Sequence, residues 1–208
     1  MSSDYPRIRG AMAGSDALYS PDGRARRARL AELVASPRPM SVEIGFGHGH
    51  FLAALAAAEP DLTVVGMEIQ QGWVRMAERR AAKLGVTNLF ALKADARVLL
   101  TLDIPPGRLS HVHILFPDPW WKPKHHKKRR LFTPELLDVL ARAIHPGGTL
   151  TLRTDVEAYA RSSAAMAEAH PAFTPAPPTA APGHDIPTRR ERRCQSEKLP
   201  IARLSWGR

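Results

Sequence analysis

Four acidic side chains stand where the parallel strands of an α/β sheet would end, and they define the chemistry open to this sequence. Each lies at the end of a short apolar run or directly after one; they are Glu43, Glu68, Asp95 and Asp118. Because the carboxyl ends of parallel strands meet at one edge of a sheet, we expect these carboxylates to face a common ligand site. Crowded carboxylates repel one another where water is scarce, which favours a ligand that is cationic or rich in hydrogen-bond donors.

A glycine-rich turn follows the first of these acids. The segment Glu43-Ile-Gly45-Phe-Gly47-His-Gly49 has glycine at every second position, whereas a dinucleotide-binding fingerprint would need glycine where this chain has His50. The acids would also repel the pyrophosphate of a dinucleotide. The turn resembles the first motif of class I S-adenosylmethionine-dependent methyltransferases, whose cofactor carries a sulfonium and an ammonium group. Glycine-rich turns are common between strands and helices, so the acids at the other strand ends carry the interpretation.

The resemblance to class I methyltransferases implies S-adenosylmethionine as the cofactor and gives several residues a role. Gly45 and Gly47 would let the backbone approach the cofactor closely. Glu68, at the end of the second strand, is placed to bind the ribose hydroxyls. Asp95, followed by Ala96, fits a contact to the edge of the adenine.

The segment after the fourth expected strand combines rigidity, aromatic surface and positive charge. It begins Phe-Pro-Asp-Pro-Trp-Trp over residues 116–121, so two prolines restrict the turn around Asp118 and two indoles offer faces on which a base can stack. Lysine and arginine follow densely up to Arg130, as suits the phosphates beside a displaced base. Two structural alternatives stay open: one indole could anchor the loop on the core, and the basic run could be a solvated surface. His125 and His126 are adjacent and point apart, so we expect no metal site.

The stretch from Phe116 to Leu131 closely resembles the signature of bacterial tRNA (guanine-N7-)-methyltransferases, which modify guanine 46 of the variable loop. The resemblance extends from about Arg38 to Leu204. It implies cofactor contacts from the four acids at the strand ends, with Asp118 also the active-site residue. The positions that it implies for substrate binding are Lys122, Lys124, His125, His126, Lys127, Lys128, Arg129, Asp155, Thr188, Arg189, Arg190 and Glu191. The chain departs from the family at Arg190, where an aromatic residue is usual, and at Trp121, which has no family role.

Strands and helices must alternate along the chain to position these residues. Apolar runs indicate strands over residues 40–44, 62–68, 88–94, 110–116 and 149–153. Helical patterns indicate helices up to residue 58 and over residues 72–84, 97–100, 134–144 and 156–170. Residues 171–187 are rich in proline and are expected to form a loop, and residues 199–204 a final antiparallel strand. The pattern predicts an α/β, Rossmann-like class I methyltransferase fold, with a mostly parallel sheet between two layers of helices.

The composition suits a single domain that binds a polyanion. The chain has 208 residues and a formal net charge of +10, which favours nucleic acid first and an anionic membrane surface second. Its one cysteine, Cys194, excludes an intramolecular disulfide and a cysteine-based metal cluster. No apolar run is long enough to span a bilayer and no secretory signal is visible, so we expect a cytoplasmic monomer or homodimer whose partner is tRNA and not a membrane.

The N-terminal region is expected to differ from the rest of the chain. Residues 1–37 are interpreted as a basic extension, mobile up to about residue 23, and residues 38–208 as the methyltransferase domain. Within the extension, residues 24–34 form a basic helical pattern. That helix could be a solvated surface element or an arm that contacts phosphates, and the sequence favours neither.

The implied reaction needs no proton transfer before the methyl group moves. Guanine N7 has an in-plane lone pair, so we expect direct in-line displacement, with Asp118 holding the guanine and supporting the positive product ring rather than acting as a general base. Two other functions remain open. The chain could be a small-molecule methyltransferase whose basic loop is incidental, or an RNA-binding module without catalysis. The second would normally lack the glycine turn or the acids, all of which are present here.

Overall fold

The computed structural model describes residues 21–118 and 131–208. The strands are β1 (Met40–Ile44), β2 (Thr63–Glu68), β3 (Leu89–Lys93), β4 (Leu109–Leu115), β5 (Ile144–Thr154), β6 (Thr174–Pro175) and β7 (Ala202–Gly207). The helices are α2 (Pro21–Ala35), α3 (His50–Ala58), α4 (Gln71–Leu84), α5 (Ala96–Leu102), α7 (Pro134–Ala143), α8 (Glu157–Glu168) and α9 (Arg189–Ser196), with a short 3-10 helix η2 (Pro178–Ala180). The expected mobility of residues 1–20 and the expected roles of residues 119–130 lie outside this description.

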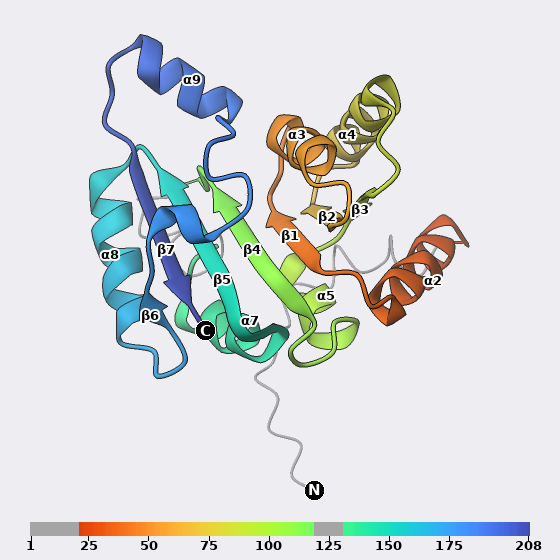
Figure 1. Ribbon diagram of the computed structural model, residues 1–208, viewed down its shortest axis with the longest axis horizontal. Helices are drawn as coiled ribbons and strands as arrows, with labels where there is room; N and C mark the ends of the chain where they lie inside the picture. The colour runs from red at the N-terminus through yellow and green to blue at the C-terminus, as the bar shows by residue number, and fades with distance from the viewer. Residues whose placement is uncertain (1–20, 119–130) are drawn as a thin grey trace, which may run out of the picture.

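The strands form one seven-stranded sheet in the order β3-β2-β1-β4-β5-β7-β6 (Figure 1). β1 pairs in parallel with both β2 and β4, and β4 in parallel with β5. β7 runs antiparallel between β5 and β6. The predicted class I fold, with a mostly parallel sheet and an antiparallel C-terminal strand, is therefore confirmed. The chain leaves β1 toward β3 and returns to β4, so the switch point between β1 and β4 is where such sheets bind ligands.

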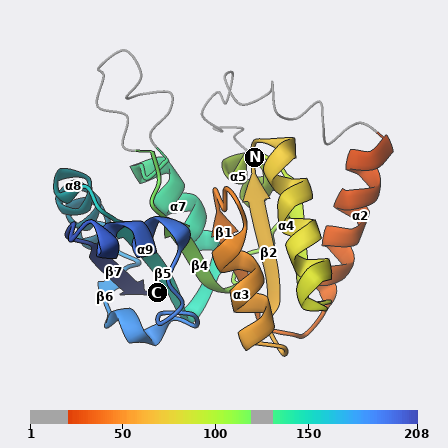
Figure 2. The ribbon, with the colours of Figure 1, turned by 90° about the horizontal axis from the view of Figure 1, so that it is seen from above.

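Helices cover both faces of the sheet (Figure 2). α3 and α4 pack over β2 and β3 through a buried cluster that includes Phe51, Leu52, Val64 and Val74. α5, α7 and α8 cover the opposite face, where a larger cluster contains the apolar residues of β1, β4 and β5. Each strand is apolar on the face that a helix covers, and this alternation determines which side chains remain to line a site.

The region predicted as a loop over residues 171–187 contains β6 and η2, and it continues into α9. It crosses the front of the sheet over β5, on the α3 side (Figure 1). Thr151 and Arg153 of β5 point to that face, opposite the apolar Leu152. A polar half-face of the sheet is therefore closed by an irregular segment.

Two C-terminal expectations need correction. The final strand covers residues 202–207 and not 199–204, because Trp206 is the side chain that packs into the core opposite Leu150 of β5. Pro200 has no N–H to donate to a neighbouring strand, and Leu199 is exposed. Residues 189–196 form α9, which was not expected from the sequence.

The basic helix α2 is docked on the domain. Arg26 Nη1 lies 2.7 Å from Glu78 Oε1, and Arg27 Nε lies 2.5 Å from Asp103 Oδ1. Leu30, on the same helix, is buried in the larger core cluster. These contacts favour the packed surface helix over the phosphate-contacting arm, because both guanidinium groups already have carboxylate partners. Among the described residues, no helix has the length and apolar character to cross a membrane.

Candidate functional site

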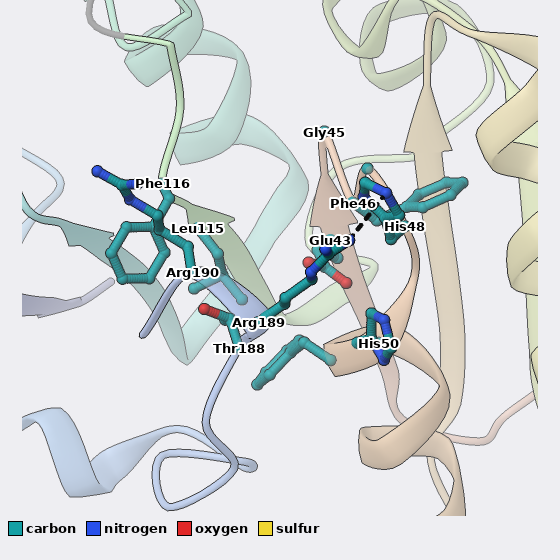
Figure 3. Close-up of a pocket in the computed structure, with 12 residues that line it drawn as sticks. Glu43, Gly45, Phe46, His48, His50, Leu115, Phe116, Thr188, Arg189 and Arg190 are labelled. Carbon is teal, nitrogen blue, oxygen red and sulfur yellow. Dashed lines mark hydrogen bonds between the residues drawn. The ribbon is translucent and has the colours of Figure 1, made fainter. Parts of the chain in front are cut away.

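Two adjoining cavities open at the carboxyl ends of the parallel strands. The larger has a volume of about 720 Å³ and lies over the ends of β1, β2 and β3. The smaller, of about 230 Å³, lies between the β1–α3 turn and the start of α9 (Figure 3). Gly45, Gly47 and Phe116 line both cavities, so the glycine turn and the end of β4 separate them. Phe116 has φ 51°, a left-handed conformation that is strained for a non-glycine residue and often marks a functional site.

The glycines of the turn have two different functions. Gly45 and Gly47 have φ of 74° and 51°, and a Cβ built on either would meet no atom within 4 Å. Both residues line the two cavities, so the open backbone of the turn can form a cradle for a ligand. Gly49 has a packing role, because a Cβ there would lie 2.7 Å from Cβ of Ala77 in α4.

Glu68 joins the glycine turn to the end of β2. Its Oε2 accepts a hydrogen bond from the N–H of Gly47 at 3.0 Å, and its Oε1 accepts from the N–H of Ile69 at 2.7 Å and of Gln70 at 3.2 Å. The side chain is buried at the wall of the larger cavity. A carboxylate has about four acceptor positions, so Glu68 keeps one for a ligand hydroxyl while it fixes the cradle.

Asp95 and Asp118 complete the acidic wall of the larger cavity. Asp95 caps α5 by accepting from the N–H of Arg97 at 2.9 Å, and its Oδ2 lies 2.8 Å from Nη2 of the same arginine. Ala96 lines the cavity beside it. Asp118 is exposed at the rim, after the end of β4. Three of the four acids therefore line one cavity, as expected from their places at the strand ends.

Glu43 lies apart from the other three acids. It lines the smaller cavity, and its Oε2 is buried without a hydrogen-bond partner among the described residues. Burial raises the pKa of Glu43 to about 8, although the nearby Arg153 acts in the opposite direction. His113 is its neighbour on β4, and burial lowers the pKa of His113 to about 3, so this imidazole stays neutral. Glu43 is thus protonated at neutral pH.

The pKa of Glu43 predicts a pH-dependent stability that Glu43→Gln removes. Below pH 4.5 both the folded and the unfolded states hold the proton. As the pH rises toward 8, the unfolded state releases it and the folded state keeps it, so the wild-type protein loses stability over this range. One pKa unit corresponds to about 1.4 kcal/mol, which makes the total loss several kcal/mol. Relative to wild type, Glu43→Gln is expected to gain stability progressively from pH 5 to pH 8.

Thermal unfolding midpoints between pH 5 and 9 test this prediction. Glu157→Gln is the matched control, because the carboxylate of Glu157 is exposed on α8 and its side chain undergoes the same chemical change. Parallel pH profiles for wild type and Glu43→Gln would contradict a buried, protonated Glu43.

The expected substrate-binding residues near α9 divide into buried and exposed members. Thr188 and Glu191 form a capping box at the start of α9, and both are buried. Arg189 and Arg190 are exposed and line the smaller cavity. Arg190 also pairs with Asp155, with 3.1 Å between its Nε and Oδ2 of the acid. Thr188, Arg189 and Arg190 thus line the smaller cavity, and Thr188 and Glu191 also hold the backbone at the start of α9; their role in substrate binding stays a prediction.

Arg153 anchors this region from beneath, and sequence reasoning missed it. Its side chain is 2% exposed and donates to the carbonyl oxygens of Gly183, His184 and Ile186 at 2.8–3.0 Å. It also pairs with Glu191, with 3.0 Å between Nη1 and Oε2. An arginine inside an apolar strand such as Leu-Thr-Leu-Arg was the available signal, because a buried arginine needs several acceptors.

The sequence did not predict Trp73, His48 or His50 as site residues, because single aromatic and basic residues form no recognisable motif. Trp73 lines the larger cavity, and its ring lies 4.0 Å from that of His48, centroid to centroid. His48 and His50 line the smaller cavity. The basic substrate residues expected after the fourth strand lie outside the described residues; they are Lys122, Lys124, His125, His126, Lys127, Lys128 and Arg129.

Comparison with known proteins identifies a family and relatives that this chain resembles. A family model described as "Putative methyltransferase" matches residues 37–204. A tRNA (guanine-N(7)-)-methyltransferase of Synechococcus sp. (strain JA-2-3B'a(2-13)) is 39% identical over 80% of this chain and 70% of its own length. A protein of the same name from Treponema pallidum (strain Nichols) is 37% identical over 92% of this chain and 75% of its own length.

Solved structures agree on the fold. The 16S rRNA methyltransferase KamB is similar with a TM-score of 0.54 and 22% identity, over 86% of this chain and 92% of that protein. An antibiotic-related methyltransferase has a TM-score of 0.58 at 14% identity, over 88% of this chain and 94% of that protein. At these identities the likeness concerns the fold alone.

Proposed function

Because this chain belongs to the family of bacterial tRNA (guanine-N7-)-methyltransferases, we propose that it methylates N7 of guanine 46 in the variable loop of tRNA. S-adenosylmethionine is the methyl donor of this class of enzyme. The observation that carries the proposal is the larger cavity, in which a glycine cradle faces three carboxylates at adjoining strand ends. We place the enzyme in the cytoplasm, as a monomer or homodimer.

The residues of the larger cavity fit this cofactor. Gly45 and Gly47 leave the turn open where side chains would fill the cradle. Glu68 would accept from the ribose hydroxyls, and Asp95 with Ala96 would lie along the adenine. The protonated Glu43 lines the neighbouring cavity, so the cationic groups of the cofactor would face the other three acids more directly.

Methyl transfer requires positioning and charge support, and no base. When bound, S-adenosylmethionine supplies a methyl group made electrophilic by its positive sulfur. The N7 lone pair of guanine would take the methyl group directly, and the electron pair of the broken carbon–sulfur bond would stay with the sulfur. Positive charge thereby moves to the purine ring. Asp118, at the rim of the cavity and after the end of β4, would accept hydrogen bonds from the guanine edge and stabilise the charged product ring.

The proposal is tested by mapping the product. The protein is incubated with labelled S-adenosylmethionine and an unmodified tRNA transcript, and the methylated nucleotide is located by digestion. We expect one 7-methylguanosine at position 46, and no transfer to a transcript whose variable-loop guanine is replaced by adenine. Transfer to a different nucleotide would overturn the assigned position. Turnover with metabolites and none with RNA would instead establish a small-molecule methyltransferase.

A further inference from the structure

A cluster of basic side chains at the mouth of the smaller cavity has no part in the proposed chemistry. It comes from segments far apart in the sequence: the β1–α3 turn, α4 and α9. Its members, called here the rim cluster, are His48, His50, Arg80, Arg189 and Arg192. Arg189 and Arg192 are exposed, and the other three are partly exposed.

Direct contacts join four members of the rim cluster, and Arg192 lies one turn after Arg189 on the same side of α9. Arg80 donates from Nε to the carbonyl oxygen of His48 at 2.8 Å. Arg189 reaches across the cavity mouth toward His48, with 3.3 Å between its Nη1 and Nε2 of the imidazole (Figure 3). The rings of His48 and His50 lie 6.3 Å apart, centroid to centroid. The cluster therefore spans both walls of the cavity, α4 and the turn on one side and α9 on the other.

The charge of the rim cluster is not neutralised within the described part of the chain. There, no carboxylate lies within 4.0 Å of the guanidinium groups of Arg80, Arg189 or Arg192. Some arginines elsewhere in the described chain have such partners, whereas Arg75, Arg79, Arg108, Arg142 and Arg208 have none there either. The paired arginines are Arg26, Arg27, Arg29, Arg38, Arg97, Arg153, Arg161, Arg190, Arg193 and Arg203. Even the neighbours of the cluster on α9 are paired, Arg190 with Asp155 and Arg193 with Glu197. The cluster is distinguished by its position, because Arg80 and Arg189 both contact His48 at the lining of one cavity.

Neutral imidazoles between unpaired cations indicate an anion site. Partial burial and the nearby arginines lower the pKa of both His48 and His50. At neutral pH both rings are therefore uncharged, each with one N–H to donate. Three guanidinium groups held around two such donors repel one another, and a bound anion would relieve that repulsion. Guanidinium groups match phosphate geometry through paired N–H donors.

We propose that the rim cluster binds backbone phosphates of the tRNA next to the nucleotide that is methylated. The inference rests on the proposed function, because it takes tRNA as the polyanion that reaches this cavity. It adds His48, His50, Arg80 and Arg192 to the RNA-binding surface. Phosphate contacts of this kind orient an RNA and carry no sequence information. The cluster thus sets how tRNA lies across the mouth of the site, and not which base is chosen.

The test is the salt dependence of tRNA binding. An unmodified tRNA transcript is titrated at several salt concentrations with wild type, Arg192→Gln and the double variant Arg80→Gln/Arg192→Gln. The slope of log K against log salt is expected to fall by about 1 for each phosphate that the protein no longer binds, so by about 2 in the double variant. Restoring charge with Arg80→Lys/Arg192→Lys is expected to recover most of the slope.

The control must remove equal charge elsewhere. Arg29→Gln/Arg161→Gln removes two exposed guanidinium groups that are each paired with a carboxylate, and it is expected to keep the wild-type slope. Affinity for S-adenosylmethionine is measured for every variant, since Arg80 also holds the carbonyl of His48 in the glycine turn. Arg192→Gln breaks no side-chain hydrogen bond among the described residues. If Arg80→Gln disturbs the glycine turn, the salt slope of tRNA binding by Arg192→Gln alone tests the proposal.

The outcomes separate the two proposals. A wild-type slope in both Arg192→Gln and the double variant, with normal methylation of tRNA by the wild-type protein, overturns the rim cluster alone. A reduced slope in a protein that does not methylate guanine supports the cluster as an RNA site and refutes the proposed function.

Discussion

Replacing Arg153 with alanine is expected to lower the free energy of unfolding by about 3–5 kcal/mol, the range typical of a buried ion pair that loses one partner. The side chain is 2% exposed, and its partner Glu191 is 1% exposed. The substitution also leaves the carbonyl oxygens of Gly183, His184 and Ile186 without their donor. The contact to Gly183 is buried and the other two are partly buried, so the loss of these hydrogen bonds adds to the cost.

The loss of Arg153 is also expected to weaken tRNA binding at the smaller cavity. Residues 183–191 close the polar half-face of the sheet and present Arg189 and Arg190 to the smaller cavity. Glu191 keeps one partner, since Arg203 Nε donates to its Oε1 at 2.8 Å. The start of α9 should therefore loosen without the domain unfolding, so tRNA affinity falls while affinity for S-adenosylmethionine is largely retained.

Chemical denaturation and tRNA titration measure the two effects. Arg161→Ala, on the exposed surface of α8, is the control and should change stability by less than about 1 kcal/mol. The double variant Arg153→Met/Glu191→Gln removes both buried charges. If the ion pair alone mattered, this variant would recover stability. We expect it to remain destabilised, because the three carbonyl oxygens still lack a donor.

Asp118→Ala is expected to reduce methyl transfer to tRNA by about 10²–10³-fold, the usual effect of losing one group that stabilises a developing charge. In the proposed mechanism the carboxylate accepts hydrogen bonds from the guanine edge and stabilises the positive charge of the product ring. Asp118→Asn keeps an acceptor but not the charge. Both variants should therefore fall well below wild type, and the alanine variant furthest.

Single-turnover rates with saturating tRNA and cofactor isolate this effect from binding. Cofactor affinity is measured separately, because Asp118 lines the larger cavity. Asp61→Asn, which removes a fully exposed carboxylate, is the control and should keep the wild-type rate. If Asp118→Asn and Asp118→Ala both transferred methyl groups at nearly the wild-type rate, Asp118 would have no role in the chemistry.

Local patterns were sufficient to predict the elements that carry the cofactor site. Apolar runs bounded by turns located β1 to β5 to within a few residues, although β5 begins earlier than expected, at Ile144. Once the sheet is parallel, the acids at the strand ends must share an edge, and three of them line one cavity. Glu43 differs because strand side chains alternate: Met40, Val42 and Ile44 face the larger core, so Glu43 faces the smaller cavity.

The wall formed by α9 depends on contacts that no local pattern records. The spacing of Thr188 and Glu191 is that of a capping box, but these two residues alone do not show what the helix packs against. Its position depends on Arg153 from β5 and Arg203 from β7, two residues that lie far apart in the chain. The same holds for the rim cluster, since Arg80 and Arg189 both reach His48 only after the sheet has formed.

The place of β7 between β5 and β6 has a consequence during protein synthesis. Glu191 is held by Arg203 as well as by Arg153, and β7 contributes Arg203. A nascent chain therefore cannot complete the α9 wall while β7 is still inside the ribosome. Trp206 of β7 also belongs to the larger core, and a domain folds as a unit, so the sheet and the α9 wall both need β7. We therefore expect both cofactor binding and tRNA capture to appear only after β7 has left the ribosome, although the basic residues 122–130 are made much earlier.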